Sequence, residues 1–357
     1  MTACPLTRRR FMDSCLRFAC GLTVTGAIGG MSQLLPDSAH AAEQDDLSDY
    51  SSRYLFHDEN KNDLRLQPLQ ARDRRGSIPN DSRPAQKRKP DQLLPPNPAA
   101  RDGVVRRVSV PSGEKICALT FDFCELATIT TGFDADMVIW MQDNNIPATF
   151  FMGGKWMRTH DRRVREILRD PLFEIGNHAW AHGNFSLLSA ERMREEILDT
   201  AGQFELLRDQ VLKDSNRSSL GEIPVQKELR LFRFPYGRCS KDSLDLLAEL
   251  GFEPIQWDVV AEAGGNNGTL ARGKAVAERV KPGSILLFHG NLVPKGTFQL
   301  LRYVTGSLMR QGYRFVTVSE LLHAGTPERA QDGYFEKPGD NHSLDTRFGA
   351  EGTGKKK

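Results

Sequence analysis

The stretch KICALTFDFCE, residues 115–125, starts as an apolar run and reaches an acid at Asp122. A short apolar run that leads to a polar residue is typical of a buried strand with a side chain of functional interest at its end. Phe123 stands where a second carboxylate would complete a catalytic pair, and Cys124 and Glu125 follow it. The stretch therefore predicts a strand, and it leaves open whether Asp122 belongs to a damaged site, a rebuilt site or an ordinary strand end.

Short apolar runs alternate with helical patterns through the rest of residues 104–325. Strands are predicted at 115–122, 148–152, 172–176, 230–234, 254–258, 284–289 and 314–318. Helices are predicted at 134–145, 189–212, 240–250, 270–280 and 297–311. Repeated βα units favour a parallel sheet, and about seven parallel strands in this length predict a distorted α/β barrel rather than an open sheet.

Ionisable residues stand at the predicted C-terminal ends of these strands. In a parallel barrel those ends form one rim, which is where the chemistry is found. The residues are Asp122, His178, His182, Arg233, Tyr236, Asp258 and His289. His178 and His182 are four apart, so within one helical turn they would face the same way and could ligate one metal ion. Two structural histidines are the alternative, and the other rim residues favour the metal site.

The flanks differ from this block. Paired arginines at 8–10, an apolar stretch at 16–31 and Ala39-His40-Ala41 predict a twin-arginine-type signal peptide over 1–41 and a periplasmic or secreted protein. The stretch is too short and too polar for a stable membrane span, which needs ~20 apolar residues. Residues 42–103 are proline-rich and basic, which predicts a disordered linker, and 326–357 are predicted to be a disordered basic tail.

Composition bounds the class of protein. The chain has 357 residues, of which 39% are hydrophobic, so it can bury a core. Lysine and arginine total 48 against 46 acidic residues, and a net charge of +2 gives no reason to expect a nucleic-acid partner. Oligomeric state does not follow from these numbers.

The rim residues, taken in order, resemble the polysaccharide deacetylase family, also called the NodB homology domain, over about Arg107 to Leu322. The similar motifs are LTFD at 119–122, HAWAH at 178–182, RFPYG at 233–237 and LLFHG at 286–290. The resemblance implies a hydrolase that removes acetyl groups from N-acetylated carbohydrates with a divalent metal, zinc above others.

The resemblance also implies roles for the residues. His178 and His182 would bind the metal, and Asp122, oriented by Arg233, would take a proton from water. The backbone N–H of Tyr236 would stabilise the oxyanion, and His289 would protonate the leaving amine. A catalytically weak carbohydrate-binding or regulatory protein and a non-sugar amidase are the alternatives.

The first motif departs from the family. The family pattern is Thr-Phe-Asp-Asp-Gly, and its second aspartate is a metal ligand, whereas this chain has Phe123-Cys124 in place of Asp-Gly. The interpretation preferred here makes Glu125 the third ligand, with Cys124, Asp122 or water as alternatives. We predict a Cys124–Cys239 disulfide, since both cysteines are expected at the rim of an exported protein, and a buried apolar role for Cys117.

The fourth motif departs as well. QWDVVAEAGG at 256–265 keeps Trp257 and Asp258 but lacks the Asp-Trp pair expected near Ala263-Gly264. In the family that later aspartate tunes the histidine that acts as general acid. The sequence therefore predicts no partner for His289.

Overall fold

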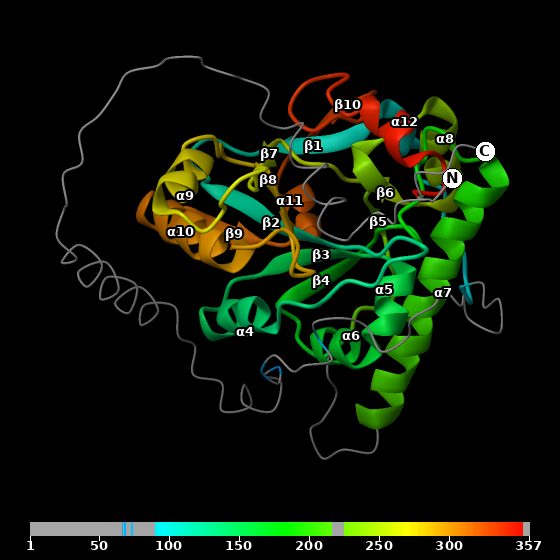
Figure 1. The fold of residues 1–357 in the computed structure, drawn as a ribbon, viewed down its shortest axis with the longest axis horizontal. Coiled ribbons are helices and arrows are strands. Elements are labelled where there is room, and N and C mark those ends of the chain that lie inside the picture. Colours follow the sequence, from blue (N-terminus) through cyan, green and yellow to red (C-terminus); the bar gives the residue numbers. More distant parts are fainter. Residues whose placement is uncertain (1–65, 67, 69–72, 74–89, 216–224, 353–357) are drawn as a thin grey trace, which may run out of the picture.

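The structure is a computed structural model that describes residues 66, 68, 73, 90–215 and 225–352 (Figure 1). These residues form an eight-stranded parallel sheet in the order β6-β5-β4-β3-β2-β8-β7, with β9 paired to β2. The strands are β2 (Ile116–Phe123), β3 (Ala148–Met152), β4 (Phe173–Asn177), β5 (Leu231–Phe232), β6 (Glu253–Pro254), β7 (Val259–Val260), β8 (Ile285–His289) and β9 (Arg314–Val316). The predicted distorted α/β barrel is confirmed.

The predicted strand at 254–258 is not formed as one element, because β6 ends at Pro254 and β7 begins at Val259. β6 and β7 lie at the two edges of the sheet, although they follow one another in the chain. One short segment therefore supplies both edges, so the sheet must curl until those edges approach each other. Sequence periodicity could not show this division, because each of the two strands is only two residues long.

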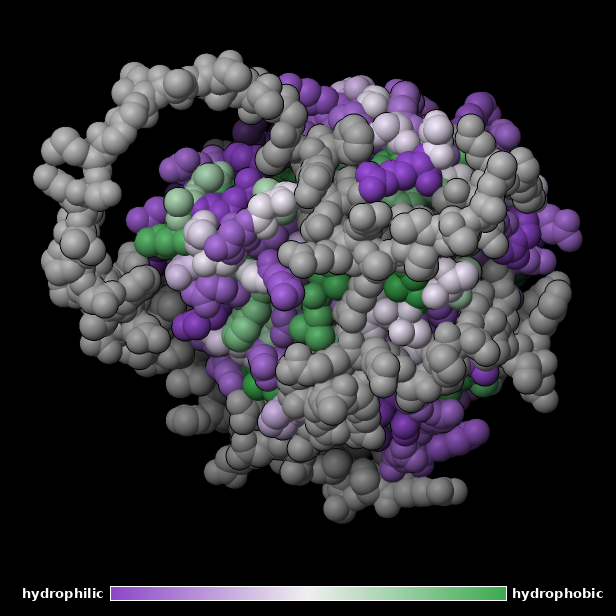
Figure 2. All heavy atoms as spheres, in the orientation of Figure 1, coloured by the Kyte–Doolittle hydropathy of each residue, from purple (hydrophilic) through white to green (hydrophobic). Residues whose placement is uncertain are grey.

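Helices pack around the curled sheet. They are α4 (Ala135–Asp143), α5 (Gly154–Thr159), α6 (Asp161–Leu168), α7 (Ala190–Ser215), α8 (Lys241–Leu250), α9 (Leu270–Ala277), α10 (Thr297–Arg310), α11 (Val318–His323) and α12 (Ser343–Phe348). All five predicted helices are present. The long helix α7 runs beside α5 and α6, and α9 packs against α10 (Figure 1). In Figure 2, hydrophilic residues are most evident at the lower right, where Figure 1 shows the long helix α7, as is usual for the outer side of an amphipathic helix.

The central strand β2 separates two apolar layers. All eight of its residues are buried. Leu119, Phe121 and Phe123 join the larger cluster beneath the helices, whereas Ile116 and Ala118 join the cluster inside the barrel. Because side chains alternate along a strand, Asp122 belongs to the inner face and Phe123 to the outer face.

A two-stranded antiparallel sheet closes the gap between the edges of the barrel. β1 (Val104–Ser109) pairs with β10 (Thr326–Ala330). Val105 forms a bridge with Ile255, and its carbonyl accepts a hydrogen bond from the backbone N–H of Gln256 at 2.8 Å. β1 therefore lies beside the segment that joins β6 to β7.

The predicted disorder of the C-terminal tail is wrong for residues 326–352. β10 and α12 are formed there, and Arg238 pairs with Asp345 at 2.6 Å. The Phe348 ring stacks on Tyr236 with 5.3 Å between centroids. Ordered structure also begins before residue 104, with a 3-10 helix, η4, at Pro98–Asp102. The folded domain therefore extends beyond the predicted 104–325 at both ends.

The predicted signal peptide, most of the predicted linker and the last five residues lie outside the described residues. Among the helices that the structure does describe, none combines the length and apolarity needed to cross a bilayer.

We expect Phe348→Ala to lower the free energy of unfolding by ~3 to 5 kcal/mol, as is usual when a buried phenylalanine is truncated. Phe348 is 1% exposed and holds the C-terminal segment against the barrel. Urea unfolding of the variant and of the wild type measures the difference. Leu212→Ala is the matched control, because Leu212 is 41% exposed and its truncation should cost little. A change within 0.5 kcal/mol, roughly that of a surface substitution, would show that the segment contributes nothing.

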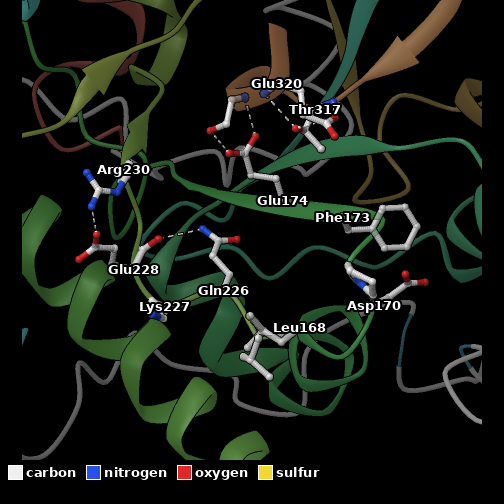
Figure 3. Close-up of a pocket in the computed structure, with 13 residues that line it drawn as sticks. Leu168, Asp170, Phe173, Glu174, Gln226, Lys227, Glu228, Arg230, Thr317 and Glu320 are labelled. Carbon is white, nitrogen blue, oxygen red and sulfur yellow. Dashed lines mark hydrogen bonds and ion pairs between the residues drawn. The ribbon is translucent and has the colours of Figure 1, made fainter. Parts of the chain in front are cut away.

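A groove of about 530 Å³ opens at the end of the barrel opposite the predicted rim (Figure 3). It is lined by the start of β4, including Phe173 and Glu174, and by Gln226 and Arg230. The Glu174 carboxylate accepts hydrogen bonds from Thr149 Oγ1 at 2.8 Å and from the backbone of Ser319 at 3.2 Å. Burial raises the pKa of Glu174. These bonds tie α11 to the sheet, so we assign Glu174 a structural role.

Candidate active site

The strand register brings the predicted rim residues together. Asp122 lies beside His289 of β8 and beside Phe151 of β3. Adjacent residues of paired strands point to the same face of a sheet, so Asp122 and His289 share the inner face. His178 follows directly after β4, and the backbone N–H of Arg233 donates to the carbonyl of Asn177 at 2.9 Å. The convergence that the sequence predicts is therefore present.

Asp258 does not belong to this rim. Its carboxylate accepts hydrogen bonds from Ser284 Oγ at 2.7 Å and from the backbone N–H of Ile285 at 2.9 Å. Both partners are at the start of β8, the opposite end of the barrel from His289. Asp258 therefore fixes the strand rather than the site.

Asp122 and Arg233 form a buried ion pair. Arg233 Nη1 donates to Asp122 Oδ1 at 2.8 Å, and the guanidinium lies 3.9 Å above the Phe151 ring. Arg233 Nη2 donates to the carbonyl of Gln256 at 3.0 Å. A guanidinium held on three sides fixes the orientation of the carboxylate that it pairs with. The other carboxylate oxygen, Oδ2, lies 3.6 Å from His178 Nε2.

His178 and His182 lie in a loop, so the predicted helical turn is wrong. Ala179 and His182 both have a φ of 61°, which no helix contains. The rings still meet, edge to face, with 5.0 Å between centroids. The left-handed backbone at Ala179 and His182 therefore brings the two imidazoles together. From the sequence, a helical turn had been expected to do this.

A buried carboxylate from α7 holds this loop. Glu196 is 1% exposed, and its Oε2 accepts hydrogen bonds from the backbone N–H groups of Trp180 and Ala181, both at 2.8 Å. This contact could not be predicted from the sequence, because Glu196 lies within an ordinary amphipathic helix.

The hydrogen bonds of His178 define its tautomer. Its Nδ1 lies 2.8 Å from the carbonyl oxygen of Arg233. A carbonyl only accepts, so Nδ1 carries the proton and Nε2 presents a lone pair. Burial lowers the pKa of His178 and lowers the pKa of His182 well below its ordinary value. Neutral imidazoles are the form that binds a metal ion.

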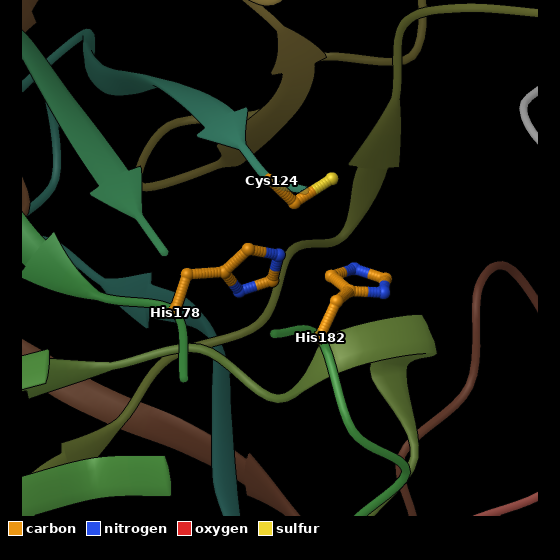
Figure 4. A group of neighbouring side chains, drawn as sticks. All are labelled: Cys124, His178 and His182. Atoms are coloured by element: carbon orange, nitrogen blue, oxygen red, sulfur yellow. The ribbon is translucent and has the colours of Figure 1, made fainter. Parts of the chain in front are cut away.

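Cys124 completes a cluster with the two histidines. One ligand atom from each of Cys124, His178 and His182 lies within 4.8 Å of the others, and Figure 4 shows the three side chains gathered around a common space. Two neutral imidazoles and a thiol are a donor set suited to zinc or a similar cation. The residues present therefore fit the divalent metal that the sequence resemblance implies.

Glu125 lies outside this cluster, so its prediction as the third ligand is wrong. Its Oε1 accepts a hydrogen bond from the backbone N–H of Thr131 at 2.7 Å, and its Oε2 lies 3.9 Å from Lys155 Nζ. The carboxylate is thus directed toward the loop after β2 and not toward the histidines.

The predicted Cys124–Cys239 disulfide is also wrong. The structure does not join the two residues, and Cys239 Sγ lies 3.7 Å from the carbonyl oxygen of Gln331, beside β10. Cys124 points instead toward His178 and His182. Cys117 is fully buried in the core, as predicted, and burial raises its pKa.

Glu262 supplies the partner that His289 lacked in the sequence. Glu262 Oε2 lies 2.5 Å from His289 Nδ1, and Oε1 accepts hydrogen bonds from the His289 backbone at 3.1 Å and from Thr297 Oγ1 at 2.5 Å. Burial opposes charging of the imidazole, but the Glu262 carboxylate outweighs it and raises the pKa of His289. An acid was expected near Ala263-Gly264, and Glu262 stands one residue before that position.

Tyr236 lies between the cluster of Cys124, His178 and His182 and the C-terminal segment. It has a left-handed backbone with φ 59°, and its ring meets the His182 ring with 4.4 Å between centroids. Its carbonyl accepts a hydrogen bond from Asn341 Nδ2 at 3.0 Å. Asn341 is a further residue that the sequence did not indicate, because it belongs to the tail predicted to be disordered.

We expect Lys155→Met to lower the free energy of unfolding by ~3 to 5 kcal/mol, because it removes one partner from a buried charged network. Lys155 is 1% exposed, and its Nζ donates to the carbonyls of Leu126, Ala127 and Ile129 at 2.6 to 3.0 Å. Urea unfolding measures the loss. Lys241→Met, at the exposed pair with Asp245, is the control and should unfold at nearly the same urea concentration as the wild type. Equal effects of the two substitutions would contradict the structural role of Lys155.

Comparison with known proteins agrees with this geometry. The polysaccharide deacetylase family model matches residues 109–255. A peptidoglycan-N-acetylglucosamine deacetylase of Bacillus cereus is 31% identical over 216 residues, which cover 60% of this chain and 91% of that protein. A chitooligosaccharide deacetylase of Sinorhizobium fredii is 25% identical and matches 45% of this chain and 67% of its own length. A solved structure described as "T48 deacetylase with substrate" is 21% identical to this chain and has a TM-score of 0.50. The match covers 64% of this chain and 100% of that one, which supports the fold.

Proposed function

Because the chain belongs to the polysaccharide deacetylase family, we propose that it is a hydrolase that uses a divalent cation to remove acetyl groups from an N-acetylated poly- or oligosaccharide. One observation carries the proposal. Asp122, oriented by Arg233, lies beside His178 on one side and beside the Glu262–His289 pair on the other. This arrangement supports roles for these residues as a base, a metal-binding pair and an acid around one point.

His178 and His182 would hold the cation through their neutral nitrogens. When bound, such a cation polarises the amide carbonyl and lowers the pKa of a water molecule from 15.7 toward ~7. The residues around it determine where protons go. The Arg233 carbonyl keeps the proton of His178 on Nδ1, so the Nε2 lone pair stays directed into the site.

Asp122 acts as the general base. It takes one proton from the water that attacks the carbonyl carbon, and the carbonyl carbon becomes tetrahedral. Arg233 holds the Asp122 carboxylate in place before this step through a hydrogen bond of 2.8 Å. The backbone N–H of Tyr236, as the sequence resemblance implies, would stabilise the negative oxygen.

His289 acts as the general acid. Its imidazolium, favoured by Glu262, gives a proton to the nitrogen as the C–N bond breaks. The products are acetate and a free amino sugar. Glu262 is a positioning residue, because it acts through His289.

The substrate class is supported by the relatives, whose printed names are peptidoglycan-N-acetylglucosamine deacetylase and chitooligosaccharide deacetylase. The proposed site of action is the periplasm or the cell exterior, which rests on the sequence pattern of residues 1–41. Peptidoglycan fragments and chitooligosaccharides are therefore the substrates to try first.

Acetate release tests the function. The purified protein is stripped with a chelator, reloaded with zinc, cobalt or no metal, and incubated with N-acetylated chitooligosaccharides and with peptidoglycan fragments. We expect acetate from at least one substrate in the metal-loaded samples and none in the stripped sample. Sugar binding without acetate from any loaded sample would favour the carbohydrate-binding alternative.

A further inference from the structure

We propose that Cys124 is the third protein ligand of the cation, as a thiolate in place of the aspartate that the family pattern has in its first motif. This inference rests on the proposed function and makes it more specific. It assigns the site two nitrogen ligands and one sulfur ligand, from His178, His182 and Cys124.

The strand pleat explains why the ligand moved by one residue. Phe123 follows Asp122 on β2 and points to the outer face, where its ring packs against Trp156 with 4.7 Å between centroids and against Phe133 at 5.9 Å. A carboxylate at this place would be buried among aromatic rings. Gly290 reinforces the arrangement, since a Cβ there would come within 2.0 Å of the Phe123 ring. The next residue on the inner face is Cys124.

Backbone contacts fix the direction of the Cys124 side chain. The carbonyl of Cys124 accepts hydrogen bonds from Thr131 Oγ1 at 3.0 Å and from Asn291 Nδ2 at 3.2 Å. Asn291 Nδ2 also lies 3.8 Å from the sulfur itself. With its peptide held in this way and 3% of the residue exposed, the thiol is held beside the two imidazoles.

The distances fit a metal site after a small contraction. With Zn–N of ~2.0 to 2.1 Å and Zn–S of ~2.3 Å, tetrahedral geometry places ligand atoms ~3.3 to 3.6 Å apart. The three ligand atoms lie within 4.8 Å of one another, so rotation of the side chains supplies the difference.

A buried cysteine by itself is commonly an inert apolar residue, and Cys117 is an example of that kind in this chain. Cys124 differs because two imidazoles share its space, with one ligand atom from each of the three residues within 4.8 Å of the others. Glu125 is directed toward Thr131 and Lys155, so it does not compete with Cys124 as a ligand.

A thiolate changes which cations the site prefers. Sulfur ligands select zinc and other soft ions, whereas an aspartate in the same place also suits hard ions such as magnesium and manganese. We therefore expect zinc or cobalt to occupy the wild-type site in the presence of a large excess of magnesium, and this preference to weaken in Cys124→Asp.

Cobalt spectroscopy on the full-length protein tests the assignment. Thiolate bound to Co²⁺ gives an intense charge-transfer band in the near ultraviolet, which nitrogen and oxygen ligands do not give. We expect this band in the cobalt-loaded wild type and in Cys239→Ser and Cys117→Ser, which remove the other two cysteines of the described structure. We expect Cys124→Asp to bind cobalt without the band, and Cys124→Ser to lose both the band and at least tenfold in cobalt affinity.

Cobalt content and acetate release are measured in the same samples. Bound cobalt with acetate release but no charge-transfer band would overturn the ligand assignment and leave the proposed function standing. A band that survives Cys124→Ser would overturn it as well. Absence of bound cobalt together with absence of acetate release would overturn both proposals.

Discussion

The Asp122→Asn variant is expected to release acetate ~10² to 10⁴ times more slowly than the wild type, which is the usual contribution of a general base. Asparagine has nearly the same shape as aspartate but cannot accept the proton from water. Because the proposed ligands His178, His182 and Cys124 are untouched, the variant should keep its bound metal. Acetate assays beside elemental analysis of the same samples measure both quantities. Activity within threefold of the wild type would remove Asp122 from the role of base.

Stability must be separated from chemistry in this test. Arg233 is 0% exposed, and Asp122 is its carboxylate partner, so the neutral asparagine leaves a buried guanidinium without a counter-charge. Breaking such a pair typically costs ~3 to 5 kcal/mol. The matched control is the Asp122→Asn, Arg233→Met double variant, which removes both charges. We expect the double variant to be more stable than Asp122→Asn and equally inactive. Recovery of activity together with stability would show that the single variant was only unfolded.

The sequence predicted the barrel and the rim that Asp122 shares with Arg233 because each rested on a strong local pattern. Apolar runs that recur with helical patterns between them indicate βα units, and β3 was predicted to the residue. Asp122 and Arg233 were predicted to share one rim because both stand at strand ends of a parallel sheet, whereas their pairing was implied by the family resemblance. Such ends meet at one rim whatever the details of the loops are.

The C-terminal segment was missed because its pattern resembles that of a disordered tail. Residues 326–352 are polar, and their order comes from contacts with distant residues. β10 pairs with β1, Asp345 pairs with Arg238, and Phe348 stacks on Tyr236. A single-sequence pattern contains no information about partners more than 100 residues away.

Glu125 was wrongly predicted as a ligand because the prediction considered the length of its side chain and not the direction in which the backbone points it. Glu125 has the longer side chain, which favoured it as a ligand, but the turn after β2 directs it to Lys155. Alternation along β2 would have favoured Cys124, had the pleat been followed one residue past the strand. Glu262 was overlooked for a related reason: the acid was sought at 263 and 264, and it stands one residue earlier on the rim.

The Glu262→Gln variant is expected to move the alkaline limb of the pH–rate profile to lower pH. Glu262 raises the pKa of His289, which keeps His289 protonated, as a general acid must be, at higher pH than an isolated imidazole. Glutamine carries no charge, so the pKa of His289 should fall and the protonated fraction at neutral pH should fall with it. We expect acetate release near pH 8 to drop ~10- to 100-fold, the range usual for residues that orient a functional histidine. The loss should be smaller near pH 6.

Stability should depend on pH in the same direction. A histidine with a raised pKa in the folded state stabilises the fold below its unfolded pKa, near 6.5, and that contribution is lost as the pH rises through the folded value. The stability difference between wild type and Glu262→Gln should therefore be largest in mild acid. Glu262→Asp is the control, because it keeps the charge and should keep part of the shifted profile. An unchanged alkaline limb in Glu262→Gln would mean that His289 does not act as the general acid, whatever the fall in rate.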